Sequence, residues 1–360
     1  MISEVILKVA GMEAEESKPY YPRPSIAGPE RCLRQMVYWA SNTPRDKRIS
    51  DRAIVVMNDS SFHETLTEDW LNKTAFRLHS QQMEVEIAEL DFYNPPFILK
   101  GHIDGIITDM LGFEALYEHK AINYFTHNRY EAGEYPLDYI TQCCLYIVGV
   151  SKLNPEITKA VLLIKDKNTS AYLDYVIDYD TDKDIAKIVE MSHSNGKKLI
   201  GDPEPLFVME NVVQGAIDRF RQVYEYVQNK TLPDRQYEIN SWHCEYCQWQ
   251  ETCWAGYEEE YQQLAQDTVL DMEIEDLCRY YLELNAHLKE MEKEKDELKA
   301  KIRQVLKAAN ASKGKAGQYV IHNRLDKYQS LNKEKIPESI LKQAMETKYK
   351  EVLTIRLIKR

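Results

Sequence analysis

The residues best suited to chemistry first occur in the stretch 101–120, which reads GHIDGIITDMLGFEALYEHK. Apolar residues alternate with polar ones on both sides of Leu111-Gly112, a pattern that predicts two β-strands joined by a tight turn. Glu118 and Lys120 are two residues apart and therefore share one face of a strand. If the strands pair, Asp104 reaches the same face. Two carboxylates and an ammonium group between apolar side chains predict a divalent-metal site with a water-handling base beside it.

The same three charged residues are also compatible with a salt-bridge ladder on an exposed edge strand, because charged cross-strand pairs are common. Further along the chain, Gln142 and Tyr146 are four residues apart on a predicted helix over 137–150 and so share one helical face. His63 falls on a predicted helix over 50–73 and matters only if that helix packs beside the two strands. These additional residues favour the metal site over the surface ladder.

A second group of chemically capable residues lies in the motif C-x2-C-x5-C, formed by Cys244, Cys247 and Cys253. Three cysteines at this spacing in a reducing compartment predict metal ligation rather than disulfides. A tetrahedral or cubane site needs a fourth thiolate, and Cys32 is the candidate, although a lone cysteine is more often a buried small apolar residue. Zinc and an iron–sulfur cluster both remain open, and a redox role is weaker because no βαβ pattern surrounds the motif.

Strands and helices alternate along the segment that must position these residues. We expect strands at 84–92, 159–165 and 171–178, and helices at 29–39, 50–73, 137–150, 180–192 and 210–229. This order predicts an α/β or α+β fold with a mixed central sheet flanked by helices.

The last hundred residues have a different pattern. From Leu277 to Val305 apolar residues recur in steps of four and three, interrupted only at Lys295, which predicts a long helix with a heptad-like stripe. The stripe is either a seam for a partner or a face packed on its own domain, and a repeat of only about four heptads favours the second. A flexible basic loop at 311–317, a strand at 318–325, a helix at 337–346 and a strand at 351–358 are expected to follow. We therefore predict two domains, 1–265 and 266–360.

Composition sets further bounds. The 360 residues are 44% apolar and 29% charged, which indicates a globular chain with room for a large core and a second module. The first residues lack the pattern of a signal peptide and no apolar run approaches membrane-spanning length, so we expect a soluble cytoplasmic protein with no membrane partner. The net charge is −12, yet residues 291–360 hold 18 Lys and Arg against 9 Asp and Glu. Charge alone neither favours nor excludes a nucleic-acid partner.

Taken together, these motifs resemble the PD-(D/E)XK nuclease superfamily, in particular its RecB-like iron–sulfur branch. That branch includes the CRISPR-associated Cas4 exonucleases, the nuclease domains of bacterial helicase–nucleases and related phage exonucleases. The resemblance spans about residues 25–260 and depends on the order and spacing of short motifs. It is carried by His63, Asp104, Glu118-x-Lys120, Gln142-x3-Tyr146 and C-x2-C-x5-C with the upstream Cys32.

The resemblance implies a role for each matching residue. His63, Asp104 and Glu118 resemble the ligands of Mg²⁺ or Mn²⁺, and Lys120 resembles the lysine that orients or deprotonates the attacking water. Gln142 and Tyr146 resemble the residues of a helix that faces the site and the DNA. Cys32, Cys244, Cys247 and Cys253 resemble the four thiolates of a [4Fe–4S] cluster that acts as a structural staple.

Three features depart from the family pattern or add to it. Ile103 rather than proline precedes Asp104, a common form in the RecB-like branch, and Glu64 beside His63 is able to share its ligand role. Cys143 and Cys144 fall inside the Gln142-x3-Tyr146 motif, and we expect them to pack in the core.

The implied fold is a restriction-endonuclease-like core with a C-terminal extension made of a long helix and a small basic β-α-β piece. The implied function is a Mg²⁺- or Mn²⁺-dependent DNA exonuclease that processes single- or double-stranded ends in recombination, repair or CRISPR adaptation, in a bacterial or phage-infected cell. A homo-oligomer or a recombination partner protein fits such a role. The alternative is a nucleic-acid-binding or assembly module that keeps the fold without cutting DNA.

Overall fold

The computed structural model describes residues 2–13, 19–257, 272–317 and 319–325. The chain divides into two compact units, Met1–Ala255 and Gly256–Arg360. The predicted domain boundary after residue 265 lies outside the described residues.

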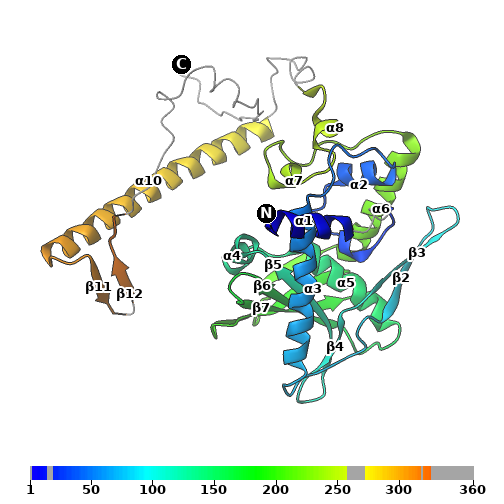
Figure 1. Cartoon of the computed structure of the whole chain (residues 1–360), viewed down its shortest axis with the longest axis horizontal. Helices are drawn as coiled ribbons and strands as arrows, with labels where there is room; N and C mark the ends of the chain where they lie inside the picture. Colours follow the sequence, from blue (N-terminus) through cyan, green and yellow to red (C-terminus); the bar gives the residue numbers. More distant parts are fainter. Residues whose placement is uncertain (1, 14–18, 258–271, 318, 326–360) are drawn as a thin grey trace. The chain divides into compact units, whose positions relative to one another are not determined.

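The first unit is built on an eight-stranded mixed sheet (Figure 1). The strands run in the order β1 (Arg77–His79), β4 (Gly105–Thr108), β5 (Glu114–Ile122), β6 (Lys159–Asp166), β7 (Tyr172–Asp180), β8 (Ile185–His193) and β10 (Phe207–Glu210), and β9 (Lys198–Ile200) pairs with β8. β5 and β6 are parallel, and the other neighbours in the sheet are antiparallel. The predicted mixed sheet is therefore confirmed.

The parallel pair β5–β6 needs a long crossover, which contains α4 (Tyr124–Glu131) and α5 (Leu137–Ser151). Successive side chains of β5 point to opposite faces of the sheet, and a different helix covers each face. Leu116 belongs to the large core that includes most of α5. Tyr117 belongs to a smaller core with Leu78 and Ile107, on which Leu71 of α3 (Asp51–Leu71) packs. The sheet is thus covered by helices on both faces, and β5 is buried between them.

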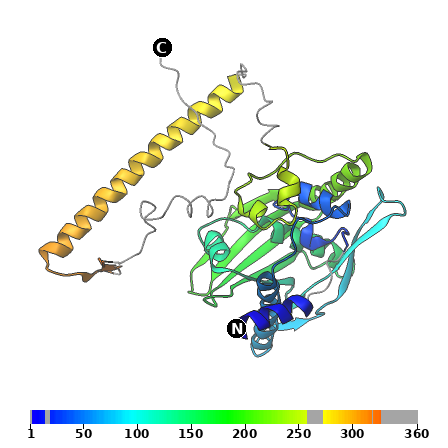
Figure 2. The ribbon, with the colours of Figure 1, turned by 45° about the horizontal axis from the view of Figure 1, so that its top comes forward.

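The remaining elements of the first unit lie around this layered core. They are α1 (Ile2–Glu13), the short 3-10 helix η1 (Pro24–Ile26), α2 (Leu33–Ala40), α6 (Val212–Asn229), α7 (Trp242–Glu245) and α8 (Gln250–Trp254). β2 (Glu84–Leu90) and β3 (Phe97–His102) form a separate hairpin, drawn as a long cyan ribbon in Figures 1 and 2. α2 packs against α6, and α5 packs against β2.

The second unit contains α10 (Met272–Ala308), β11 (Lys313–Ala316) and β12 (Tyr319–His322). α10 is 37 residues long and confirms the predicted long helix. β11 pairs with β12 in an antiparallel hairpin. The hairpin lies close to the end of α10, where Leu306 is buried beside Gly314.

One predicted helix is wrong. The segment 180–192 was expected to be helical, and its Ile185, Ile188 and Val189 do fit a helical stripe. It forms the end of β7 and most of β8, and β8 bonds to β7 along one edge and to β9 and β10 along the other. Non-local strand pairing therefore overrides a local pattern that suited either structure.

The predicted basic loop at 311–317 is also wrong, since Lys313–Ala316 forms strand β11. Its glycines and lysines have low strand propensity, and only pairing with β12 makes it a strand. The predicted strand at 318–325 contains β12. The predicted helix at 337–346 and strand at 351–358 lie outside the described residues.

Candidate functional site

Glu118 and Lys120 meet on one face of β5. Lys120 Nζ donates a hydrogen bond to Glu118 Oε1, and the two side chains are 21% and 1% exposed. Gln142 of α5 donates to the same oxygen through Nε2, at 2.8 Å. The predicted shared face of Glu118 and Lys120 is therefore confirmed, and α5 supplies a third group to it.

Asp104 joins this pair from the bend between β3 and β4. Its Oδ2 accepts a 2.9 Å hydrogen bond from the backbone N–H of His119, the residue between Glu118 and Lys120. The antiparallel register of β4 on β5, with Gly105 opposite Tyr117, carries Asp104 to this point. The structure thus brings Asp104, Glu118 and Lys120 together as the sequence predicted.

Helix α3 contributes acidic side chains to the same site. The carboxylate of Asp104 acts with burial to raise the pKa values of both Glu64 and Glu68. Glu64 is also within electrostatic reach of Lys120 and Glu118. We use the name carboxylate site for these four acidic residues together with Lys120 and Gln142. Glu68 was missed from the sequence, and its spacing of one helical turn from Glu64 is the signal that would have placed the two on one face.

His63 has different electrostatic neighbours. Its pKa is lowered by burial and then by the ammonium groups of Lys165 and Lys167, while Asp59 opposes the shift. Lys165 is a buried residue of β6 whose Nζ lies 5.3 Å from the centre of the Trp70 ring. The helix was expected to present His63 to the metal. In this structure the next residue of the helix, Glu64, interacts electrostatically with Asp104, Glu118 and Lys120.

The charges in the carboxylate site strongly perturb one another. Burial raises the pKa of Glu118 to about 7; the Lys120 ammonium opposes this shift and the Asp104 carboxylate adds to it. Burial disfavours the charged form of Lys120, but Glu118 and Asp104 outweigh it and raise the lysine pKa. Without a bound cation, Lys120 is thus an ammonium donor and Glu118 is on the border of protonation.

The residues of this site fit a divalent cation in their chemistry. Glu118 Oε2 is buried and has no hydrogen-bond partner. Such an orphaned carboxylate oxygen beside Asp104 and Glu64 is the donor that Mg²⁺ or Mn²⁺ prefers. No group of three or more His, Cys, Asp or Glu side chains among the described residues is already arranged to hold a metal ion. The side chains of the carboxylate site would therefore have to move for a cation to bind.

The second residue of the predicted helical motif is mainly a core residue. Tyr146 is 5% exposed, and it is hydrogen bonded to Gln142, which lowers its pKa while burial raises it. A Cβ atom at Gly101 would lie 2.8 Å from the Tyr146 ring, so this position needs glycine for close packing. Cys143 and Cys144 are fully buried in the core, as expected.

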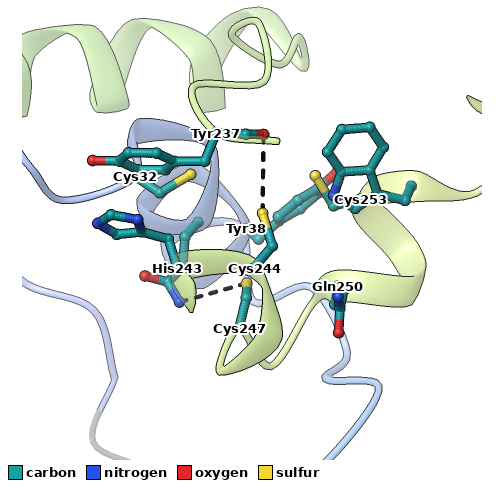
Figure 3. Close-up of a pocket in the computed structure, with 10 residues that line it drawn as sticks. Cys32, Tyr38, Tyr237, His243, Cys244, Cys247, Gln250 and Cys253 are labelled. Atoms are coloured by element: carbon teal, nitrogen blue, oxygen red, sulfur yellow. Dashed lines mark hydrogen bonds between the residues drawn. The ribbon is translucent and has the colours of Figure 1, made fainter. Parts of the chain in front are cut away.

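The four predicted cluster cysteines lie around one pocket (Figure 3). Cys32 is the residue before α2, whereas Cys244 and Cys253 belong to α7 and α8 and Cys247 lies between those helices. We call this the thiol pocket. Its lining residues are Cys32, Gln35, Tyr38, Tyr237, His243, Cys244, Cys247, Gln250, Cys253 and Trp254. The structure therefore joins Cys32 to the C-x2-C-x5-C motif despite their separation in sequence.

Side-chain hydrogen bonds hold the two distant segments together at the thiol pocket. Asp46 accepts a 2.9 Å bond from the backbone N–H of Thr252, and Trp249 Nε1 donates to the Thr43 carbonyl at 3.0 Å. Tyr237 donates its hydroxyl to the Glu30 carbonyl at 2.5 Å. These bonds bring the pocket walls together without a continuous β-ladder.

The thiols of the pocket are close enough to act on one another. Burial raises the pKa of Cys32, and the thiolates of Cys253 and Cys244 would raise it further. Burial also raises the pKa values of Cys247 and Cys253, each again with a second pocket cysteine as a contributor. All four are free cysteines. Four thiols around one pocket have the chemistry to bind a soft metal ion with release of their protons, but among the described residues they too form no group already arranged to hold one.

Comparisons with known proteins give no family for the chain. No protein-family model matches it, and no curated protein matches it. A solved structure described as "Crystal structure of SSO0001" is 14% identical, with 71% of this chain and 97% of that chain covered and a TM-score of 0.36. A likeness of that size carries no argument about activity. Among the described residues, no helix has both the length and the apolar content to cross a membrane.

Proposed function

We propose that the protein is a Mg²⁺- or Mn²⁺-dependent DNA exonuclease of the RecB-like PD-(D/E)XK type. The observation that carries this proposal is the buried Glu118 carboxylate, which accepts hydrogen bonds from Lys120 and Gln142 and keeps one oxygen without a partner. A structural ion pair would be expected to have both carboxylate oxygens satisfied.

The chain's own residues divide the work of phosphodiester hydrolysis. Asp104, Glu118 and Glu64 would hold the cation, which when bound neutralises phosphoryl oxygens and lowers the pKa of its bound water. Lys120 is the hydrogen-bond donor beside them and would orient or deprotonate the attacking water. Gln142 fixes Glu118 in its rotamer through the 2.8 Å bond. The hydrogen bond of Asp104 to the β5 backbone fixes the second carboxylate.

For the thiol pocket we propose a [4Fe–4S] cluster held by Cys32, Cys244, Cys247 and Cys253. Its support is the convergence of four free cysteines, from segments more than 200 residues apart, on one pocket. Such a cluster would close a very long loop and tie α2 to the end of the first unit. Metal analysis separates iron from zinc, and a colourless protein with stoichiometric zinc would reject the cluster without touching the nuclease proposal.

A cleavage assay tests the nuclease proposal. DNA labelled at the 5′ or the 3′ end, single- or double-stranded, is incubated with protein and Mg²⁺ or Mn²⁺. We expect the wild type to release labelled products, and Lys120→Ala to retain DNA binding but lose cleavage. A matched control is Lys183→Ala, because Lys183 is an exposed lysine paired with Asp180. A wild type that shifts DNA in a gel but never cuts it would instead support the non-cleaving binding module.

A further inference from the structure

The apolar stripe of α10 is exposed in the second unit. Its members alternate at steps of three and four along one side of the helix. Within the described residues they are all at least 43% exposed: Tyr281, Leu284, Leu288, Met291, Leu298, Ile302 and Val305. An apolar stripe of this length in water needs a covering surface.

The stripe has the sequence of a two-stranded seam. In heptad positions, Tyr281, Leu288 and Ile302 occupy a, and Leu284, Met291, Leu298 and Val305 occupy d. Ile302 at a beside Leu298 at d is the combination that favours two strands, and the remaining a and d residues do not distinguish the number of strands. Lys295 takes one a position, and a single polar a residue specifies register and a low oligomer state at a cost in stability.

The charges that flank the stripe favour a second copy of the same helix in parallel orientation. In a parallel, in-register pair, Glu294 at g lies opposite Lys299 at e of the second copy, and His287 lies opposite Glu292. Both contacts are attractive or neutral. Lys299 pairs with Asp296 of its own helix at 3.3 Å, but both side chains are more than half exposed, so that pair opposes little.

An antiparallel pair, in the register that overlaps the whole stripe, brings like charges together. That register places Glu294 beside Glu294 of the second copy and Glu292 beside Glu292. Both contacts are repulsive. In the parallel pair the flanking charges therefore attract, and the like charges that meet are Lys295 and Lys295 of the second copy in the seam. In the antiparallel pair the flanking charges repel, and Lys295 faces Met291.

We propose that α10 is a dimerisation helix, which pairs with α10 of a second copy as a parallel two-stranded coiled coil. This interaction is independent of DNA cleavage and of both metal centres. Sedimentation equilibrium of the full chain tests it. We expect a mass that rises with concentration to twice the 42.2 kDa of one chain. A monomer that persists to about 100 μM would overturn the proposal and indicate that the stripe packs on its own chain.

A pair of aspartate substitutions locates the interface. Leu288→Asp places a charge in the stripe and is expected to weaken the dimer about 100-fold or more, since two carboxylates would be buried. Ala286→Asp adds the same charge on the outer side of the same helix and is expected to change the dissociation constant less than about threefold. Equal effects of the two variants would overturn the assignment of the seam.

A charge exchange decides the orientation. Glu294→Lys should weaken a parallel dimer about tenfold, because two attractive contacts become repulsive, and adding Lys299→Glu should restore it. In an antiparallel dimer Glu294→Lys would relieve repulsion and tighten the association, which would overturn the parallel arrangement. Lys295→Leu should tighten the parallel dimer without producing species larger than a dimer, because it removes two opposed ammonium groups from the seam. A trimer or larger wild-type species would overturn the two-stranded arrangement.

Discussion

The carboxylate site and the thiol pocket are both concentrations of metal-binding side chains, but the fold assembles them differently. Asp104, Glu118 and Gln142 lie within 39 positions of one another and are placed by the register of β4 on β5 and by α5. Cys32 meets Cys244 across more than 200 residues, where the walls are joined by isolated hydrogen bonds rather than a ladder. The core thus fixes the backbone of the carboxylate site, whereas among the described residues only isolated hydrogen bonds join the walls of the thiol pocket. We therefore expect the order of the thiol pocket to depend more on a bound group.

The largest effect is expected from a substitution that disrupts the carboxylate site alone. Glu118→Gln keeps the size of the side chain and one acceptor oxygen for Lys120 and Gln142 but removes the negative charge. We expect DNA cleavage to fall about 10³-fold, as for the loss of a preorganised charge-stabilising group. Visible absorbance and iron content should remain at wild-type levels, because the thiol pocket is built separately. Loss of iron in this variant would contradict the independence of the two regions.

The next largest effect is expected from a substitution that disrupts the thiol pocket alone. Cys32→Ser should lose bound iron and lower the free energy of unfolding by on the order of 3 kcal/mol, comparable to opening a covalent closure of a long loop. Hydrogen exchange should speed up in α2, α7 and α8 while β5 and β6 stay protected. Cys278→Ser is the matched control, since Cys278 is a free cysteine of α10. Uniformly faster exchange across the sheet would show that the cluster supports the whole unit.

The pH dependence of stability, measured with a chelator present to remove divalent cations, tests the electrostatics of the carboxylate site. Glu118 has a folded pKa of about 7, raised from 4.5 by burial. Between these two pKa values the folded state keeps a proton that the unfolded chain loses. The free energy of unfolding therefore falls as the pH rises from about 4.5 to about 7. Between pH 5 and pH 8 we expect the wild type to lose about 2 kcal/mol of unfolding free energy relative to Glu118→Gln.

Thermal or denaturant unfolding of both proteins at each pH measures this difference. Added Mg²⁺ should reduce the loss, since a bound cation stabilises the ionised carboxylate. A difference that grows in the opposite direction with pH would mean that Glu118 is ionised throughout the range and that Lys120 outweighs burial.

The smallest expected effect concerns the edge of the carboxylate site. Tyr146→Phe removes a hydroxyl hydrogen bonded to Gln142 but keeps the buried ring against Gly101. Because Gln142 retains its bond to Glu118, we expect cleavage to fall less than about tenfold and stability to change by about 1 kcal/mol. A loss as large as that of Glu118→Gln, in an assay of cleavage at saturating DNA, would assign Tyr146 a direct contact with the DNA.

Local patterns were sufficient for some parts of the first unit. The helix over 50–73 is present as Asp51–Leu71, and it begins where Ser50 accepts a hydrogen bond from the backbone N–H of Ala53. The helix over 137–150 and the strands over 159–165 and 171–178 are also present. Strong apolar periodicity and clear ends made these segments predictable. The segment over 180–192 was mispredicted because its pattern suited both a helix and a strand.

The amino-acid sequence by itself determined which side chains share a local face: Glu118 with Lys120 through the period of a strand, and Gln142 with Tyr146 through a helical turn. Only the tertiary structure decided which of these faces meet. Strand register carried Asp104 to the backbone of His119, and the packing of α3 gave Glu64 rather than His63 the electrostatic contacts with the acidic pair. The reason is that side-chain direction follows from local backbone geometry, whereas contact between distant segments depends on burial and pairing across the whole fold.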